Sequence, residues 1–273
     1  MIAQPPVLVA PDSFGGELRA PVVAAAIARG LERAGVTPLP ELCPVSSGGR
    51  GTIEALLPAL GGTTGDGFAL IEDGGTAIVE LDPSASLTAA RLAGAAASGA
   101  EVVILAAAAG AGAGSDAGSE SGVGDHGADT GEHHGARLLG ALAEHGGLGA
   151  AALVVLCDAR DPGPLAVRLH DEGGARLVAG APFVLEALGF DVRMRAARAV
   201  IVGERRLERA TLRGRVTGEI AVRARQSGVP CHAVAGTDAI DRFDARILDL
   251  QAILEATTVA ELEAAGEALA AYL

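Results

Sequence analysis

Short apolar runs alternate with segments of helical spacing at both ends of this chain of 273 residues. Near the start, residues 7–10 (VLVA) form an apolar run between two prolines, and a helix is expected over residues 21–34. Near the end, residues 199–202, 229–235 and 250–254 are further apolar runs separated by helical segments. Apolar runs of this length that alternate with helices are typical of a parallel sheet covered on both faces. The pattern therefore predicts an α/β fold.

Two turns near the start of the chain carry polar residues between an extended run and a helix. Asp12 and Ser13 follow the first predicted strand directly, where they suit either a ligand site or the capping of the next element. Residues 46–52 (SSGGRGT) precede a helix expected over residues 53–60. Free backbone N–H groups in such glycine turns can cradle an oxyanion. The second turn matches neither the phosphate loop G-x-x-x-x-G-K-[ST] nor a well-formed G-x-G-x-x-G.

Positive charge is concentrated in residues 199–225 (AVIVGERRLERATLRGRVTGEIAVRAR). The chain has 21 Lys and Arg residues, all of them arginine, and seven fall in this stretch. The pattern predicts a strand over 199–202, a turn beginning at Gly203 and a helix over 216–225. Guanidinium groups at the carboxyl end of a buried strand suit a carboxylate or phosphate ligand. The alternative is a solvated face on which Glu204 and Glu208 offset some of the arginines.

Composition excludes several classes of function. The formal net charge of −13 and the near absence of aromatic residues oppose binding of DNA or RNA. The chain shows neither a secretory signal nor an apolar run long enough to cross a bilayer, so we expect a cytoplasmic protein without membrane contact. The three cysteines are widely separated, which indicates buried side chains and no disulfide framework or thiolate zinc site.

Three stretches carry a family resemblance, in the expected order along the chain. V-L-V-A-P-D-S-F-G-G-E-L resembles the I-A-P-D-S-F-K-G-S-L of type I glycerate kinases, and P-V-S-S-G-G-R-G-T resembles their P-V-A-D-G-G-E-G-T. V-I-V-G-E-R-R-L-E-R-A-T-L-R-G-R resembles V-I-T-G-E-G-R-x-D-x-Q-T-x-x-G-K. Weaker similarities lie at residues 99–118 and 155–162, so the resemblance covers most of the chain.

The chain departs from this family pattern at several motif positions. In the first motif the lysine is replaced by glycine, and in the second motif both acidic residues are replaced. In the third motif the Asp, Gln and Lys are replaced, and so is the Asn of a weaker motif. The residues that stand at these positions are Gly15, Ser47, Arg50, Glu208, Ala210, Arg215 and Ser115. The chain is also shorter than the family norm between residues 119 and 176.

The resemblance implies two α/β domains. Residues 1–66 and 183–273 would form a discontinuous Rossmann-like domain, and residues 67–182 a reduced domain inserted between them, with the active site in the cleft. Residues 110–147 are so rich in Gly, Ala and Ser that we expect a flexible loop. The acidic and histidine side chains of this loop match no helical metal-ligand spacing.

The resemblance further implies a kinase that moves the γ-phosphoryl group of ATP onto a hydroxyl of D-glycerate, with Mg²⁺ bound and 2-phosphoglycerate as product. Asp12, Asp158 and Arg206 would be catalytic, and Glu204 and Asp116 would bind the metal. The residues expected to bind substrate or phosphate are Ser13, Gly48, Gly49, Arg50, Thr52, Gly203, Thr211, Gly214 and Arg215.

Several of these residues also suit a purely structural role. Asp158 also suits a turn, Asp116 a solvated loop, and Glu204 and Arg206 a mutual surface ion pair. The lost motif residues leave two alternative functions open: a catalytically degenerate relative that binds an anionic metabolite or a partner, and a kinase for another small hydroxy acid. The sequence is compatible with a homo-oligomer as well as with a monomer.

Overall fold

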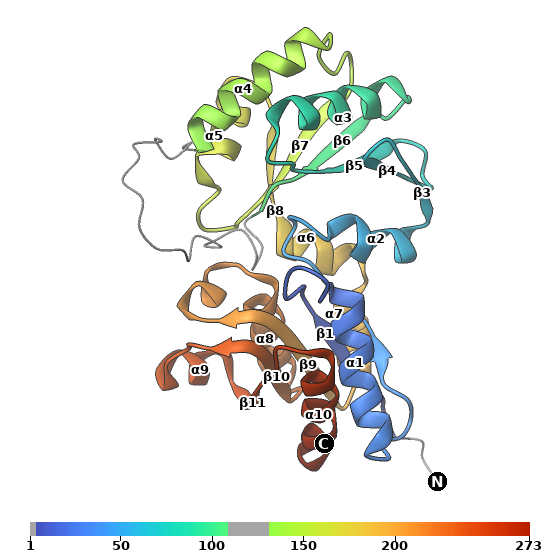
Figure 1. Ribbon diagram of the computed structural model, residues 1–273, viewed down its shortest axis with the longest axis vertical. Coiled ribbons are helices and arrows are strands. Elements are labelled where there is room, and N and C mark those ends of the chain that lie inside the picture. Colours follow the sequence, from blue (N-terminus) through green and yellow to red (C-terminus); the bar gives the residue numbers. More distant parts are fainter. Residues whose placement is uncertain (1–3, 109–130) are drawn as a thin grey trace.

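Strands from both ends of the chain pair into one sheet in the computed structural model, which describes residues 4–108 and 131–273 (Figure 1). All neighbouring strands of this sheet are parallel. In spatial order the strands are β11 (Leu250–Glu255), β10 (Cys231–Asp238), β9 (Ala199–Leu207), β1 (Val7–Pro11) and β2 (Glu41–Leu42).

The middle of the chain forms a second sheet in which the strands follow one another in chain order. Its first two pairings are antiparallel and the remaining three are parallel. The strands are β3 (Gly62–Gly65), β4 (Phe68–Ile71), β5 (Thr76–Glu80), β6 (Val102–Ala106), β7 (Ala152–Cys157) and β8 (Arg176–Ala179). The expected mixed α/β fold with parallel sheets is confirmed.

Helices cover both faces of the first sheet, as the burial of every residue of β1 requires. Val7 and Val9 pack against helices α1 (Ala20–Arg33) and α10 (Val259–Leu269). Leu8 and Ala10 point to the opposite face, in a core that includes α7 (Phe190–Ala196) and α8 (Val216–Ser227). Strand side chains alternate in direction, so a fully apolar run is buried only when both faces are covered.

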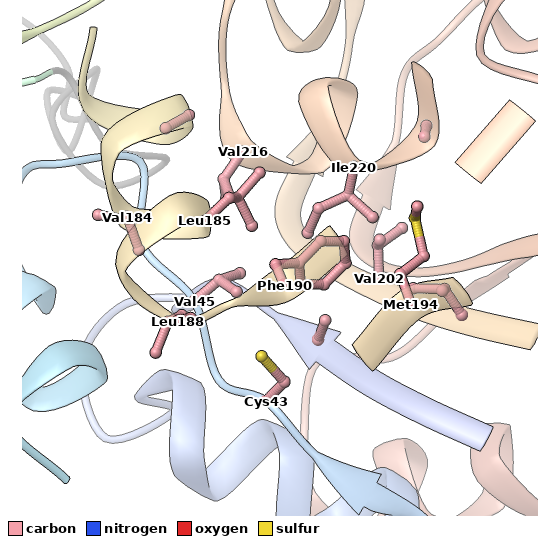
Figure 2. Packing of buried hydrophobic residues seen from close by; sticks show 14 of the residues in the cluster. Cys43, Val45, Val184, Leu185, Leu188, Phe190, Met194, Val202, Val216 and Ile220 are labelled. Atoms are coloured by element: carbon pink, nitrogen blue, oxygen red, sulfur yellow. The ribbon is translucent and has the colours of Figure 1, made fainter. Parts of the chain in front are cut away.

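Helices α2 (Thr52–Leu60) and α6 (Gly180–Ala187) lie between the two sheets (Figure 1). They contribute to a single buried cluster that reaches from Val200 in the first sheet to Ile104 in the second. Figure 2 shows Phe190 within this cluster, among side chains from α6, α7 and α8. The proposed domain limit between residues 182 and 183 falls inside α6, and the division into two domains stays a prediction.

The second sheet is covered on its other face by α3 (Ala85–Ala97), α4 (Gly131–Glu144) and α5 (Gly163–Asp171). Helix α4 corrects the expectation of a loop throughout residues 110–147. Its side chains Leu138 and Leu142, four residues apart, are buried in the core of this layer. Tertiary burial of this apolar stripe outweighs the low helix preference of the neighbouring glycines.

Strand β9 also differs from expectation, because it continues through Gly203 to Leu207. Strand β10 runs beside it and pairs Ala235 with Glu204 and Thr237 with Arg206, which extends the ladder beyond the predicted turn. Gly203 instead allows the close approach of β1, since a Cβ atom there would lie 2.6 Å from the Cβ of Pro11.

The remaining elements are short or lie at helix ends. They are α9 (Arg242–Leu248), η1 (Arg209–Arg213) and η2 (Ala270–Tyr272). The predicted capping box at the start of the last helix is confirmed: Thr258 Oγ1 accepts from the N–H of Glu261, whose carboxylate accepts from the N–H of Thr258. All three cysteines are buried and free. Within the described ranges, every helix is too short or too polar to span a membrane.

Candidate active site

The order of the strands reverses direction between β1 and β9. The chain passes from β1 to β2 on one side and from β9 through β10 to β11 on the other. The connections that leave these two neighbours diverge, and ligands of open α/β sheets bind in the crevice that this leaves at the carboxyl ends. The register aligns Pro11 with Gly203, and the N–H of Asp12 donates to the Gly203 carbonyl at 2.9 Å. Asp12 and Glu204 thus follow the aligned pair at this switch point.

Asp12 is buried, with 6% of its surface exposed. Its Oδ1 accepts from the N–H of Ser13 at 2.6 Å, and its Oδ2 accepts from Ser47 Oγ at 3.1 Å. Burial raises the pKa of Asp12 to about 6, against the opposing effect of these donors and of the Arg215 charge. A carboxyl group with such a pKa changes protonation near neutral pH, which suits proton transfer.

Glu204 is more deeply buried, at 2% exposed, and both of its carboxylate oxygens have donors. Arg215 Nη1 donates to Oε1 at 2.8 Å, and Thr211 Oγ1 donates to Oε2 at 2.9 Å. Burial raises the pKa of Glu204 to about 7, opposed by Arg215 and Thr211 and reinforced by the charge of Asp12. The two acids therefore disfavour each other's ionisation.

Glu208 joins the two arginines that the third motif contributes. Its Oε1 accepts from Arg215 Nη2 at 3.1 Å, and its Oε2 accepts from Arg206 Nε at 3.1 Å. Arg215 is thereby held between two carboxylates in a half-buried position. Arg206 is more exposed, with 53% of its side chain accessible, and only its Nε atom is used in this contact. Arg206 is the better placed of the two for an incoming anion.

The glycine turn of residues 46–52 is held closely against the second sheet. Gly48, with φ of +93°, lies so near the backbone of Gly180 that a Cβ atom there would be 2.5 Å from the Gly180 Cα. Glu80, at the end of β5, accepts from the N–H groups of Gly51 and Ile53 at 3.0 and 2.9 Å. Burial raises the pKa of Glu80, opposed by these N–H donors and by Arg50. The first N–H groups of α2 thus already hold a carboxylate.

Asp158 follows β7 and reaches the same region from the second sheet. Gly214, with φ of +113°, lies against the next residue: a Cβ atom at Gly214 would be 3.4 Å from the N atom of Ala159. The carboxyl end of β7 therefore borders the turn between η1 and α8, next to Arg215. Asp158 is half-buried there. Asp116 lies outside the described residues.

A cavity of about 200 Å³ opens at the same edge of the first sheet. Among the described residues, Arg206 is the only predicted site residue that lines this cavity. The lining residues are Phe14, Leu18, Arg205, Arg206, Gly236, Thr237 and Thr257. Its size suits a small acid or one phosphate group.

The structure gathers most of the predicted site residues, whose roles stay predictions. Asp12 is hydrogen-bonded to Ser13 and Gly203, and through Ser47 to the turn that contains Gly48, Gly49, Arg50 and Thr52. Glu204, which follows Gly203 directly, is hydrogen-bonded to Thr211 and Arg215. Sequence reasoning gave no site role to Ser47, Glu208 or Glu80. Ser47 was detectable, because it follows the strand next to β1 in the sheet, whereas Glu80 lies in the other sheet and offers no local signal.

Metal binding by a preformed cluster finds no support in residues 4–108 and 131–273. These residues contain no group of three or more His, Cys, Asp or Glu side chains that could hold an ion.

Comparison with known proteins identifies the group to which the fold and motifs belong. A sequence model of the glycerate kinase family matches residues 7–110 and 145–271. The crystal structure of a protein from Salmonella typhimurium LT2, provisionally named glycerate kinase 2, is similar with a TM-score of 0.68 and 18% identity, over 98% of each chain. No curated protein matches the chain significantly.

Proposed function

Because the chain belongs to the glycerate kinase family, we propose that it transfers the γ-phosphoryl group of ATP to a hydroxyl of D-glycerate, with 2-phosphoglycerate as product. Family membership supports a kinase-type transferase with a small-molecule substrate. The observation that carries the proposal is the buried pair of acids Asp12 and Glu204 at the switch point of the parallel sheet, beside Arg215 and close to Arg206.

Asp12 is the best candidate for the group that accepts the proton of the attacking hydroxyl. It lies at the carboxyl end of a central strand, and its two hydrogen bonds fix the plane of its carboxylate. With a pKa of about 6, Asp12 is ionised at neutral pH while remaining a base of useful strength. Asp158, which enters from β7, is the second candidate for contact with the hydroxyl.

Arg206 is the best candidate for binding the carboxylate of the substrate or a phosphate. Its guanidinium is anchored at Nε by Glu208 and lines the cavity at the edge of the sheet, so its two Nη groups can address a ligand. Arg50, exposed on the glycine turn, is a second candidate. Arg215 is engaged by two carboxylates, and we assign it to holding Glu204 in place.

The residues present fit Mg²⁺ only in part. The carboxylate of Asp12 accepts from Ser13 and Ser47 and, among the described residues, has no arginine partner at hydrogen-bond distance, and Asp158 provides a further carboxylate. Both oxygens of Glu204 accept from Arg215 or Thr211, so we place Asp12 and Asp158 before Glu204 as metal ligands. When bound with ATP, Mg²⁺ neutralises charge on the transferring phosphoryl group. Asp116 keeps its proposed metal role from the resemblance alone.

A second candidate function is that of a non-catalytic relative that binds an anionic metabolite. The observation that favours it is the carboxylate of Glu80 on the first N–H groups of α2, where a phosphate was expected. The absence of the family lysine, with Gly15 at that position, points the same way. A kinase for another small hydroxy acid is a variant of the main proposal, in which the exchanged residues change substrate choice.

The decisive experiment supplies the purified protein with ATP, Mg²⁺ and D-glycerate and follows ADP and phosphoglycerate. We expect turnover, and we expect Asp158→Asn and Arg206→Ala to lower it by two or more orders of magnitude, or roughly 3 kcal/mol in barrier height, with unchanged circular dichroism. Arg213→Ala removes an exposed arginine of the same segment and is the matched control. If product forms with another hydroxy acid but not with D-glycerate, the protein is a kinase for that other acid. If no hydroxy acid gives product, the result supports the non-catalytic relative.

A further inference from the structure

A second cavity opens at the amino ends of β10 and β11. Its volume is about 430 Å³, within the usual range of small-molecule sites. Thr237, in the cavity that Arg206 lines, is five residues farther along β10 than His232, in this one, or roughly 16 Å at the usual rise of a strand. The two cavities are therefore separate. The residues that line the second cavity are Arg225, Gly228, Val229, Pro230, His232, Asp249, Gln251 and Tyr272.

His232 is the buried polar residue of this cavity, with 1% of its surface exposed. Within the described residues, neither of its ring nitrogens has a hydrogen-bond partner. Buried nitrogen atoms are nearly always paired, because an unpaired one loses its hydration without compensation. An imidazole that lines a cavity and has no partner in the protein therefore indicates a ligand that hydrogen-bonds to it from the cavity.

The ladder between β10 and β11 is irregular beside His232. Cys231 pairs with Leu250, but Ala233 pairs with Ile253, so two residues of β11 lie opposite His232. One of the two is Gln251, which lines the cavity. Irregularities of this kind redirect side chains and are frequent beside functional sites. The irregularity in this sheet falls at the wall of the cavity.

The wall of the cavity carries one positive and one negative side chain. Arg225, at the end of α8, donates from Nη1 to the carbonyl of Ile247, and Asp249 Oδ1 accepts from Gln251 Nε2 at 3.1 Å. Neither Arg225 nor Asp249 forms an ion pair within the described ranges, so both charges are available to a ligand. Burial lowers the pKa of His232, which keeps the imidazole uncharged at neutral pH. A molecule with one positive and one negative group therefore matches this cavity better than an anion or a cation does.

Tyr272 adds an aromatic surface to the cavity. It belongs to η2, which follows α10 at the C-terminal end of the chain (Figure 1). Its ring centroid is 6.1 Å from that of His232, and 59% of Tyr272 is exposed. Val229 and Pro230 line the same cavity. Such apolar and aromatic surface suits an apolar or aromatic group of a ligand.

We propose that this second cavity binds a free α-amino acid with an apolar or aromatic side chain. Arg225 binds its carboxylate and Asp249 its ammonium group. His232 hydrogen-bonds to one of these two groups, and Tyr272 contacts the side chain. The site shares no residue with the candidate active site, so the inference does not depend on the proposed kinase activity.

The first test titrates the full chain with L-phenylalanine, L-tryptophan, L-leucine and L-methionine by calorimetry. We expect at least one to bind and to shift the NMR signals of the His232 ring, which are assigned by their loss in His232→Leu. For the tightest binder, the amine that lacks the carboxylate and the acid that lacks the amino group should each bind about tenfold more weakly or worse, because each leaves one charge of the cavity without a partner.

Single variants assign the two charges. Arg225→Gln should weaken binding of the amino acid by about tenfold or more and leave binding of the amine unchanged. Asp249→Asn should weaken the amino acid in the same way and leave the acid unchanged. Asparagine tolerates the left-handed backbone of this position, where φ is +56°. Arg246→Gln removes an exposed arginine of α9 that does not line the cavity, and as the matched control it should have no effect.

Three results would overturn the proposal. The first is that none of the four amino acids binds. The second is that Arg246→Gln weakens binding as much as Arg225→Gln does. The third is that Arg206→Ala abolishes binding while Arg225→Gln does not, which would place the amino acid in the candidate active site. Turnover of glycerate, present or absent, enters none of these comparisons, so the kinase proposal can fail while the second site is supported.

Discussion

Replacement of Asp12 by asparagine should stabilise the protein at neutral pH and leave its stability almost unchanged in acid. Asparagine has the same shape and carries no charge. Its carbonyl oxygen can accept from the N–H of Ser13, and its amide can face the oxygen of Ser47 where Asp12 now accepts. The variant therefore removes the penalty of burying a carboxylate while keeping the hydrogen-bonded contacts.

The expected size follows from the pKa of Asp12, which burial raises from the usual 3.8 to about 6. One pKa unit corresponds to about 1.4 kcal/mol, so ionisation of Asp12 lowers the free energy of unfolding by about 3 kcal/mol. Below pH 4 the acid is protonated in both the folded and the unfolded state, and the penalty is absent. As pH rises from 4 to 6, the unfolded chain releases its proton first, so stability falls with rising pH and the penalty is constant above that window.

Urea unfolding at a series of pH values between 4 and 8 checks this prediction. The difference in free energy of unfolding between Asp12→Asn and wild type should grow from near zero at pH 4 to about 3 kcal/mol above pH 6. Turnover, if glycerate kinase activity is present, should fall in the same variant. A difference that stays constant with pH would refute the reasoning, because it would show that Asp12 titrates alike in both states.

Three further predictions concern the scaffold and the charges near the site. Gly48→Ala should lower the free energy of unfolding by more than about 3 kcal/mol, because a Cβ atom there would lie 2.5 Å from the backbone of α6. Gly16 also has a positive φ but faces open space, so Gly16→Ala should lower the free energy of unfolding by only about 1 kcal/mol. Urea unfolding of the two variants makes this comparison. Arg215→Met should lower the free energy of unfolding by about 3–5 kcal/mol at pH 8, and by less at pH 5.5, where the buried Glu204 is protonated. An equal decrease at both pH values would contradict this prediction. Burial lowers the pKa of His232, so as pH falls through about 6.5 the unfolded chain binds a proton before the folded protein does, and the folded protein loses stability. His232→Leu should therefore reduce the decrease in the free energy of unfolding between pH 7 and pH 5. The same decrease in the variant and the wild type would show that His232 does not cause it.

Local patterns were sufficient for the elements at both ends of the chain. The apolar run that became β1 needs burial on both faces, and the Thr258 capping box satisfies N–H groups within its own first turn. The position of Asp12 directly after β1 could also be read from the sequence, because parallel strands place their carboxyl ends at one edge. The family itself was recognisable from short motifs in the right order.

Other features depended on partners far away in the chain. Strand β9 extends past Gly203 only because β10 lies beside it, and α4 forms in a glycine-rich stretch because Leu138 and Leu142 find a core. The anion expected on α2 is supplied by Glu80, from the opposite sheet. No spacing of nearby residues carries such information.

The sequence by itself determined the α/β class and the residue types available for acid, base and anion contacts. That strands from both ends of the chain share one sheet was implied only by the family resemblance. Tertiary structure decided what those residues do to one another. It paired Arg215, which stays a predicted phosphate ligand, with Glu204, and it placed Ser47 against Asp12. Burial also raised the pKa of Asp12 and of Glu204. The physical reason is that secondary structure follows from contacts within a few residues, whereas burial and charge pairing arise only when separate strands, helices and turns pack together.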